Sequence, residues 1–234
     1  MQRRPDTIPV RSHDALFSPL VYALLATLLV GVLMLFAPAF VDPAALTHFI
    51  AEDQPLEQGT VLVWMLAGVC LLWPGRRPRW PALSFAIFCF TMGVREQGLP
   101  ASIVPHGRRL VQSDFYLNGP ESLTYRLVAG AVVLLCVLAV LHVLIFLSQE
   151  AWKTLRHFTS RLDTALFVTG IAVLVAGQLA EAMAKYPGVV MQLFPEGWNA
   201  KLSLEAVEES WEAMGALIIF LGAFVSRRLG RTPA

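Results

Sequence analysis

The sequence predicts an all-α membrane protein: a polytopic bundle of about six transmembrane helices, built as one domain over residues 1–234. Hydrophobic residues make up 56% of the chain and charged residues only 15%, whereas soluble domains are about 45–50% apolar and about 25% charged. The apolar residues also gather in long runs. Because an open-ended chain can satisfy its backbone in lipid only as a helix, these runs predict transmembrane helices.

Six segments are long and apolar enough to cross about 30 Å of hydrocarbon, which takes about 20 residues of helix. They are residues 19–40, 57–73, 81–98, 125–147, 163–184 and 205–226. The first follows a basic N-terminus, as a signal peptide does, but it is longer than the ~7–15 apolar residues of a signal peptide. We therefore expect it to be a span. Short connections favour antiparallel neighbours.

Polar residues and glycines characterise the later segments. Residues 57–73 begin with Glu57 and stop before Pro74, and residues 81–98 run from Pro81 to Gly98. Small residues allow helices to approach closely in a membrane. We therefore expect the fifth and sixth spans to be in contact at four glycines, Gly170, Gly177, Gly215 and Gly222.

The basic residues predict that both chain ends lie in the cytoplasm, because Lys and Arg concentrate on that side of a membrane. Alternate ends of the six spans carry four groups of three basic residues. These are Arg3, Arg4, Arg11; Arg76, Arg77, Arg79; Lys153, Arg156, Arg161; and Arg227, Arg228, Arg231. Thirteen of the seventeen acidic residues fall on the other side. The positive-inside rule does not explain that excess.

Several classes of function are not indicated. The net charge of +1 gives no basic field for nucleic acid. Cys70, Cys89 and Cys136 stand singly in apolar runs, as packing residues do. The sequence has no HExxH, GxSxG, P-loop or dinucleotide fingerprint. His142 is predicted to have a packing or hydrogen-bonding role, while His48 and His106 are placed on the acidic side.

Counting 1.5 Å per residue along each helix places several polar side chains at one depth, near the acidic side. Arg95 and Glu96, for example, lie about 21–23 Å from the start of the third span. The layer comprises Glu57, Arg95, Glu96, Gln178, Glu181, Glu208, Glu209 and Glu212. Charges at this depth are costly and usually face a bundle interior or a water-filled cavity. One arginine cannot neutralise the carboxylates, so we expect metal, protons, a cationic ligand or water to compensate.

Some residues of this layer can be explained by helix stability alone, without a functional role. Glu57, Glu205 and Glu208 open helices, where a carboxylate favours the helix dipole. Arg95 and Glu96, by contrast, lie near a helix C-terminus, as does Glu181 on another helix. A carboxylate is unfavourable there. A buried ion pair of structural origin between Arg95 and a glutamate stays open as an alternative.

Two motifs resemble a loose family of uncharacterised bacterial multi-span inner-membrane proteins. They are the run Glu52-Asp53-Gln54-Pro55-Leu56-Glu57 before the second span and Glu205-x-x-Glu208-Glu209-x-x-Glu212 opening the last. Arg95-Glu96-Gln97 departs from that family, whose third span tends to end in a pair of acids. The resemblance implies a bacterial inner-membrane location and no particular activity.

Our preferred functional hypothesis is that the layer binds a cation or a cationic solute beneath the outer leaflet. Carboxylates without cysteine or paired histidine favour a divalent cation such as calcium, magnesium or manganese, with Glu181, Glu209 and Glu212 as its ligands. One alternative is a metal-dependent enzyme acting on a lipid or lipid-linked substrate. Another is an accessory subunit that docks a membrane or periplasmic protein. The expected surroundings are membrane lipids, without nucleic acid.

Overall fold

A computed structural model describes residues 14–51, 54–73, 80–97, 122–157, 162–185 and 198–229. Its helices, in chain order, are α1 (Asp14–Phe36), the 3₁₀ helix η1 (Ala37–Ala39), α2 (Pro43–Ile50), α3 (Pro55–Leu72), α4 (Trp80–Glu96), α7 (Leu123–His157), α8 (Leu162–Lys185) and α10 (Ala200–Leu229). These described ranges contain no strand. The predicted all-α fold is therefore confirmed.

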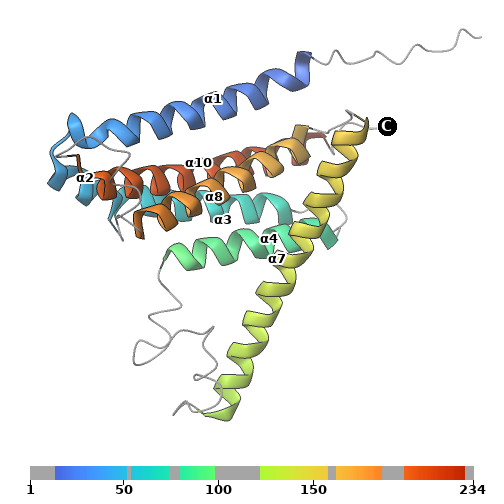
Figure 1. Ribbon diagram of the computed structural model, residues 1–234. Helices are drawn as coiled ribbons and strands as arrows, with labels where there is room; N and C mark the ends of the chain where they lie inside the picture. The colour runs from blue at the N-terminus through green and yellow to red at the C-terminus, as the bar shows by residue number, and fades with distance from the viewer. Residues whose placement is uncertain are drawn as a thin grey trace, which may run out of the picture.

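The helices form a bundle around α10, which contacts α1, α2, α3 and α8 (Figure 1). The α8–α10 pair is the most extensive contact, followed by α3 with α4. Helix α7 packs mainly on α4, and its first half diverges from the bundle (Figure 1). The described start of α1 and the end of α10 lie at the same end of the bundle. Which side of a membrane this end faces stays a prediction.

Within the described residues, five segments are long and apolar enough to cross a membrane. They are Leu20–Ala39, Pro43–Leu72, Leu123–Phe146, Leu162–Lys185 and Ala200–Ser226. The third predicted span, residues 81–98, corresponds to α4, which is not among the five. Its 17 residues measure about 26 Å at 1.5 Å per residue, somewhat less than the hydrocarbon thickness. It nevertheless packs along α3 inside the bundle.

Two helices are longer than their apolar runs predicted. Helix α7 continues to His157 and thus extends past the predicted end at residue 147. Helix α10 begins at Ala200, before the predicted residue 205, because the Asn199 side chain caps it by accepting a hydrogen bond from the Leu202 amide at 3.1 Å. Hydropathy marks the part of a helix that crosses lipid and omits such capped, polar ends.

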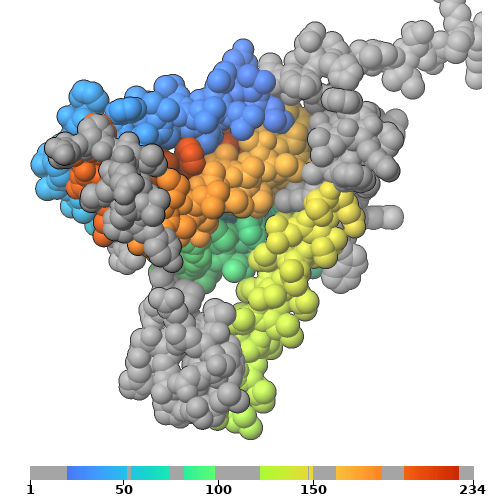
Figure 2. All heavy atoms as spheres, viewed as in Figure 1, coloured from blue at the N-terminus to red at the C-terminus, as the bar shows by residue number. Residues whose placement is uncertain are grey.

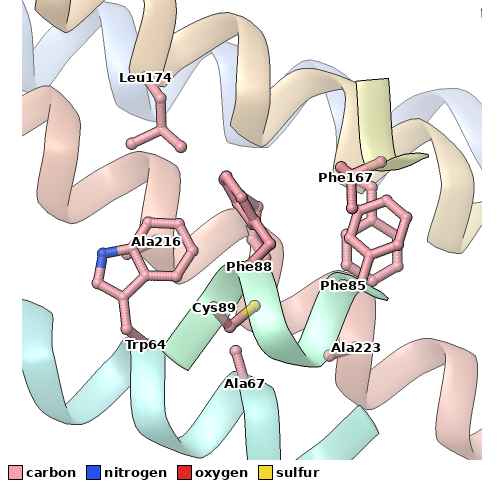
Figure 3. Packing of buried hydrophobic residues seen from close by; sticks show 11 residues of the cluster. Trp64, Ala67, Phe85, Phe88, Cys89, Phe167, Leu174, Ala216 and Ala223 are labelled. Carbon is pink, nitrogen blue, oxygen red and sulfur yellow. The ribbon is translucent and has the colours of Figure 1, made fainter. Parts of the chain in front are cut away.

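The core is an aromatic cluster between α3, α4 and α8 (Figure 3). The Trp64 ring meets Phe88 edge-on, with ring centroids 5.8 Å apart, and Phe85 lies 4.6 Å from Phe167. Helix α10 contributes small residues to the same cluster, among them Ala216. Large rings from three helices thus fill the space that the small residues of the central helix leave open.

Glycines bring α8 and α10 into backbone contact, as predicted. A Cβ atom at Gly170 would lie 3.0 Å from the Gly215 carbonyl oxygen, and one at Gly215 would lie 3.1 Å from the Gly170 oxygen. Near the two ends of the pair, a Cβ at Gly222 would lie 3.3 Å from the Asp163 oxygen, and one at Gly177 would lie 3.4 Å from the Glu208 oxygen. The two helices are therefore antiparallel and in close register.

Helix α1 is attached to α10 by a tryptophan. The indole N–H of Trp211 donates to the Thr27 carbonyl oxygen at 3.2 Å, and its ring fills the notch left by Gly31. The other faces of α1 and of α7 are lined by exposed leucines and valines. Both helices form projecting parts of the surface (Figure 2). An apolar surface of this kind suits contact with lipid.

The short helix α2 lies over the start of α10. Leu46 and Ile50 of α2 are buried against Leu202 and Ala206 of α10. Phe49 on the same helix is 42% exposed. The short helix α2 thus packs on the bundle through Leu46 and Ile50.

Candidate functional site

The antiparallel helices bring the predicted polar residues to one end of the bundle. Glu57 lies in the first turn of α3 and Arg95 in the last turn of α4. The C-terminal part of α8 carries Gln178, and the N-terminal half of α10 carries Glu212. The polar cluster, as we define it, comprises Glu57, Arg95, Glu96, Gln178, Glu208, Glu209 and Glu212.

Glu212 is the centre of this polar cluster. The residue is only 5% exposed. Its Oε1 accepts a hydrogen bond of 2.6 Å from the Gln178 amide and one of 3.5 Å from Arg95 Nη2. The side chain of Glu212 lies close to the backbone of α8, since a Cβ added at Gly177 would be 3.7 Å from the Glu212 Cγ. Three helices thus converge on one carboxylate oxygen.

Glu96 is the second nearly buried carboxylate. Its Oε1 lies 3.7 Å from Arg95 Nη1, within range of an ion pair and beyond hydrogen-bonding distance. This oxygen is buried and has no hydrogen-bond donor among the described residues. A buried acceptor without a donor costs free energy. Arg95 therefore lies between two carboxylates, on its own helix and on α10, without fully satisfying either.

The remaining glutamates of the polar cluster are partly buried and close enough to interact electrostatically. Glu209 interacts with Glu57, Glu96, Glu208 and Glu212. Glu57 also forms further contacts within the described structure. Five carboxylates thus interact with one another in the polar cluster, while Arg95 interacts with two of them, Glu96 and Glu212. The polar cluster as a whole is strongly acidic.

Glu181, which the sequence placed in the same layer, lies at the margin. Its carboxylate pairs with Lys185 one turn along the same helix. It also lies within electrostatic range of Arg95 and of Glu208. This ion pair was not predicted, although a spacing of four residues is typical of an ion pair on a helix.

The predicted metal ligands are not assembled into a ready metal site. Among the residues that the structure describes, no three or more His, Cys, Asp or Glu side chains are arranged to hold an ion. Glu181 is turned to Lys185, while Glu212 is held by Gln178 and Arg95. A metal at Glu181, Glu209 and Glu212 therefore stays a prediction that requires these side chains to move.

Two other predictions concern histidines. His142 is hydrogen-bonded, as predicted, with Nδ1 2.6 Å from the Ser84 hydroxyl oxygen on α4. His48 is exposed on α2. His106 and the Glu52-Asp53 pair lie outside the described residues.

Trp64, to which the sequence gave no functional role, is fully buried in the core. Its indole N–H has no hydrogen-bond partner among the described residues. The nitrogen points away from Phe85 and Phe167 (Figure 3). In the sequence, Trp64 stands within an apolar run, and this position indicates only a packing role.

No family model, curated protein or solved structure matches this chain in the comparisons made with them. What can be inferred about function therefore comes from the chemistry of the polar cluster. It offers several carboxylate acceptors, one guanidinium donor and one amide donor, at the end of a bundle with span-capable helices.

Proposed function

We propose that this membrane protein binds a cation or a cationic solute in the polar cluster. The observation that carries the proposal is that Glu96 and Glu212, whose side chains are 9% and 7% exposed, share the guanidinium of Arg95. Removing a carboxylate from water costs several kcal/mol unless it is paired and hydrogen-bonded. Since two carboxylates share one cation and others lie nearby, a bound positive charge would stabilise the site.

The position of the polar cluster supports the same proposal. Ionisable residues within membrane bundles usually face an interior or a cavity and mark the path or site of a ligand. We further propose that the bundle lies in a bacterial inner membrane with this end on the periplasmic side. The four basic groups of the sequence fall at the opposite ends of the spans.

Calorimetric titration of the purified full-length protein tests the proposal. The probes are Mn²⁺, Ca²⁺, Mg²⁺ and tetramethylammonium, each added to the wild type and to Glu212→Gln. Glutamine keeps the shape and the hydrogen bond to Gln178 but removes the charge at the centre. We expect it to weaken binding at least ten-fold, which corresponds to about 1.4 kcal/mol.

The matched control is Glu205→Gln on the same helix. The side chain of Glu205 is 39% exposed and pairs with Lys201 at 3.5 Å. It lies outside the polar cluster, so binding should stay within two-fold of the wild type. Circular dichroism melting of both variants separates lost binding from lost folding. The proposal fails if no probe binds the wild type, or if binding is equal in Glu212→Gln and in Glu205→Gln.

A further inference from the structure

We infer that the ligand of the polar cluster is a zwitterion, with a primary ammonium that enters towards Glu96 and Glu212 and an anionic group that stays outside at Arg95. This inference rests on the proposed function and names the class of ligand. It follows from how the charges are layered, from an unsatisfied acceptor and from the spacing of the ionic groups.

The charges are layered from the surface inwards. The side chain of Arg95 is 50% exposed, whereas those of Glu96 and Glu212 are 9% and 7% exposed. The positive group is thus the more exposed one, and the two carboxylates with which it pairs are more deeply buried. A ligand that carries only a positive charge has no group that could pair with the guanidinium of Arg95. A ligand with both charges matches the two layers.

The unsatisfied acceptor on Glu96 indicates the chemistry of the ligand's positive end. The buried Oε1 of Glu96 has no hydrogen-bond donor among the residues described. A primary ammonium carries three N–H donors, so it can donate to Glu96 and to Glu212 together. A quaternary ammonium has none. A bare divalent ion would need several oxygens around one point, and the described side chains do not form such a group.

Arg95 has donors left for the negative end. Its contacts with Glu212 and Glu96 are long, at 3.5 Å and 3.7 Å, and use two of its nitrogen atoms. A guanidinium has five N–H donors and binds phosphate or carboxylate in a bidentate manner. Because Arg95 lies so close to both carboxylates, the two charges of the ligand must be a few ångströms apart. A phosphate or carboxylate joined to the ammonium through a short linker fits this spacing.

Such a group occurs on lipids and in solution. The ligand is therefore either the phosphoethanolamine headgroup of a membrane lipid or a dissolved zwitterion of the same chemistry. The polar cluster lies at the end of a bundle of span-capable helices, where lipid headgroups and dissolved solutes both occur. The lipid differs from the dissolved zwitterion by its diacylglycerol group, and the exposed apolar faces of the helices could contact its acyl chains.

Binding measurements on the full-length wild type in detergent micelles test the inference. The dissolved probes are phosphoethanolamine, phosphocholine and ethylammonium, and the lipid probes are phosphatidylethanolamine and phosphatidylcholine, followed by native mass spectrometry. We expect the primary ammonium to bind at least about ten-fold more tightly than the quaternary one, since hydrogen bonds to charged groups are lost in the latter. Selectivity in the lipid pair alone identifies a headgroup, and selectivity in the dissolved pair identifies a soluble ligand.

Two variants assign the ends of the ligand. Glu96→Gln should reduce the preference for primary over quaternary ammonium to less than three-fold. Arg95→Gln should remove the preference for phosphoethanolamine over ethylammonium, while ethylammonium still binds. Glu205→Gln serves as the control and should retain both preferences.

Equal binding of phosphoethanolamine and phosphocholine, together with equal binding of the two lipids, would overturn the inference. The proposed function would survive this result if Mn²⁺ or tetramethylammonium still bound in a manner that depends on Glu212. If none of the probes bound the wild type, the inference and the proposed function would both be wrong.

Discussion

A methyl group at position 170 has no room between α8 and α10. An added Cβ would lie 3.0 Å from the Gly215 carbonyl oxygen, 3.2 Å from the Ile219 amide nitrogen and 2.5 Å from Ile219 Cγ1. The isoleucine side chain can rotate away, but the two backbone atoms belong to α10 itself. Gly170→Ala therefore forces the two helices apart by several tenths of an ångström.

The size of the effect follows from a comparison with Gly59→Ala. Gly59 lies in α3 with nothing within 4 Å of an added Cβ. Both substitutions gain the same helix propensity, about 0.5–1 kcal/mol. Only Gly170→Ala also carries the cost of overpacking, about 1–3 kcal/mol. The two variants should thus differ in their free energies of unfolding by about 1–3 kcal/mol, with Gly170→Ala the less stable.

Reversible unfolding in mixed detergent micelles, followed by circular dichroism, measures this difference. Gly177→Ala provides a second comparison on α8, because its Cβ would meet its nearest neighbours at an ordinary 3.4–3.7 Å. We expect both Gly59→Ala and Gly177→Ala to be more stable than Gly170→Ala. If Gly170→Ala unfolds at the same denaturant concentration as Gly59→Ala, α8 and α10 do not touch at this glycine.

Two further contacts between helices give measurable expectations. Gly31→Ala places a Cβ in conflict with the Trp211 ring and should destabilise the protein by about 1–3 kcal/mol. A Gly31→Ala/Trp211→Ala double variant that is no more stable than the sum of the two single effects would argue against the clash. Ser84→Ala removes the 2.6 Å hydrogen bond to His142 and should show a coupling energy with His142→Ala of about 0.6–1.7 kcal/mol in a double-mutant cycle, whereas zero coupling would exclude the bond.

The helices and their glycine contacts were predictable because lipid leaves the backbone few choices. An apolar run of about 20 residues forms a helix whatever its neighbours are. A glycine repeat on two successive helices then indicates close contact, and Gly170 and Gly215 do meet. The start of α10 was missed because Asn199 sets it through a capping hydrogen bond, which hydropathy does not register.

The polar cluster was predictable as a layer but not as a set of contacts. Depth along a helix follows from counting residues, and this placed Arg95, Gln178 and Glu212 together. Which side chains pair depends on how each helix is rotated about its axis, and no count of residues gives that angle. The pairing of Glu181 with Lys185 illustrates the consequence. A local partner four residues away turns this carboxylate from the centre of the layer to its margin.

The pairing of Arg95 was left open by the sequence, and its geometry explains why the polar cluster still lacks positive charge. Opposite unit charges 3.5 Å apart attract each other by about 4–5 kcal/mol at an effective dielectric constant of about 20. Water screens this attraction further, because half of the Arg95 side chain is exposed. Desolvation costs several kcal/mol for each buried carboxylate. One guanidinium shared between Glu96 and Glu212 can thus offset one of them and not both, so the second charge has to come from a proton or from a ligand.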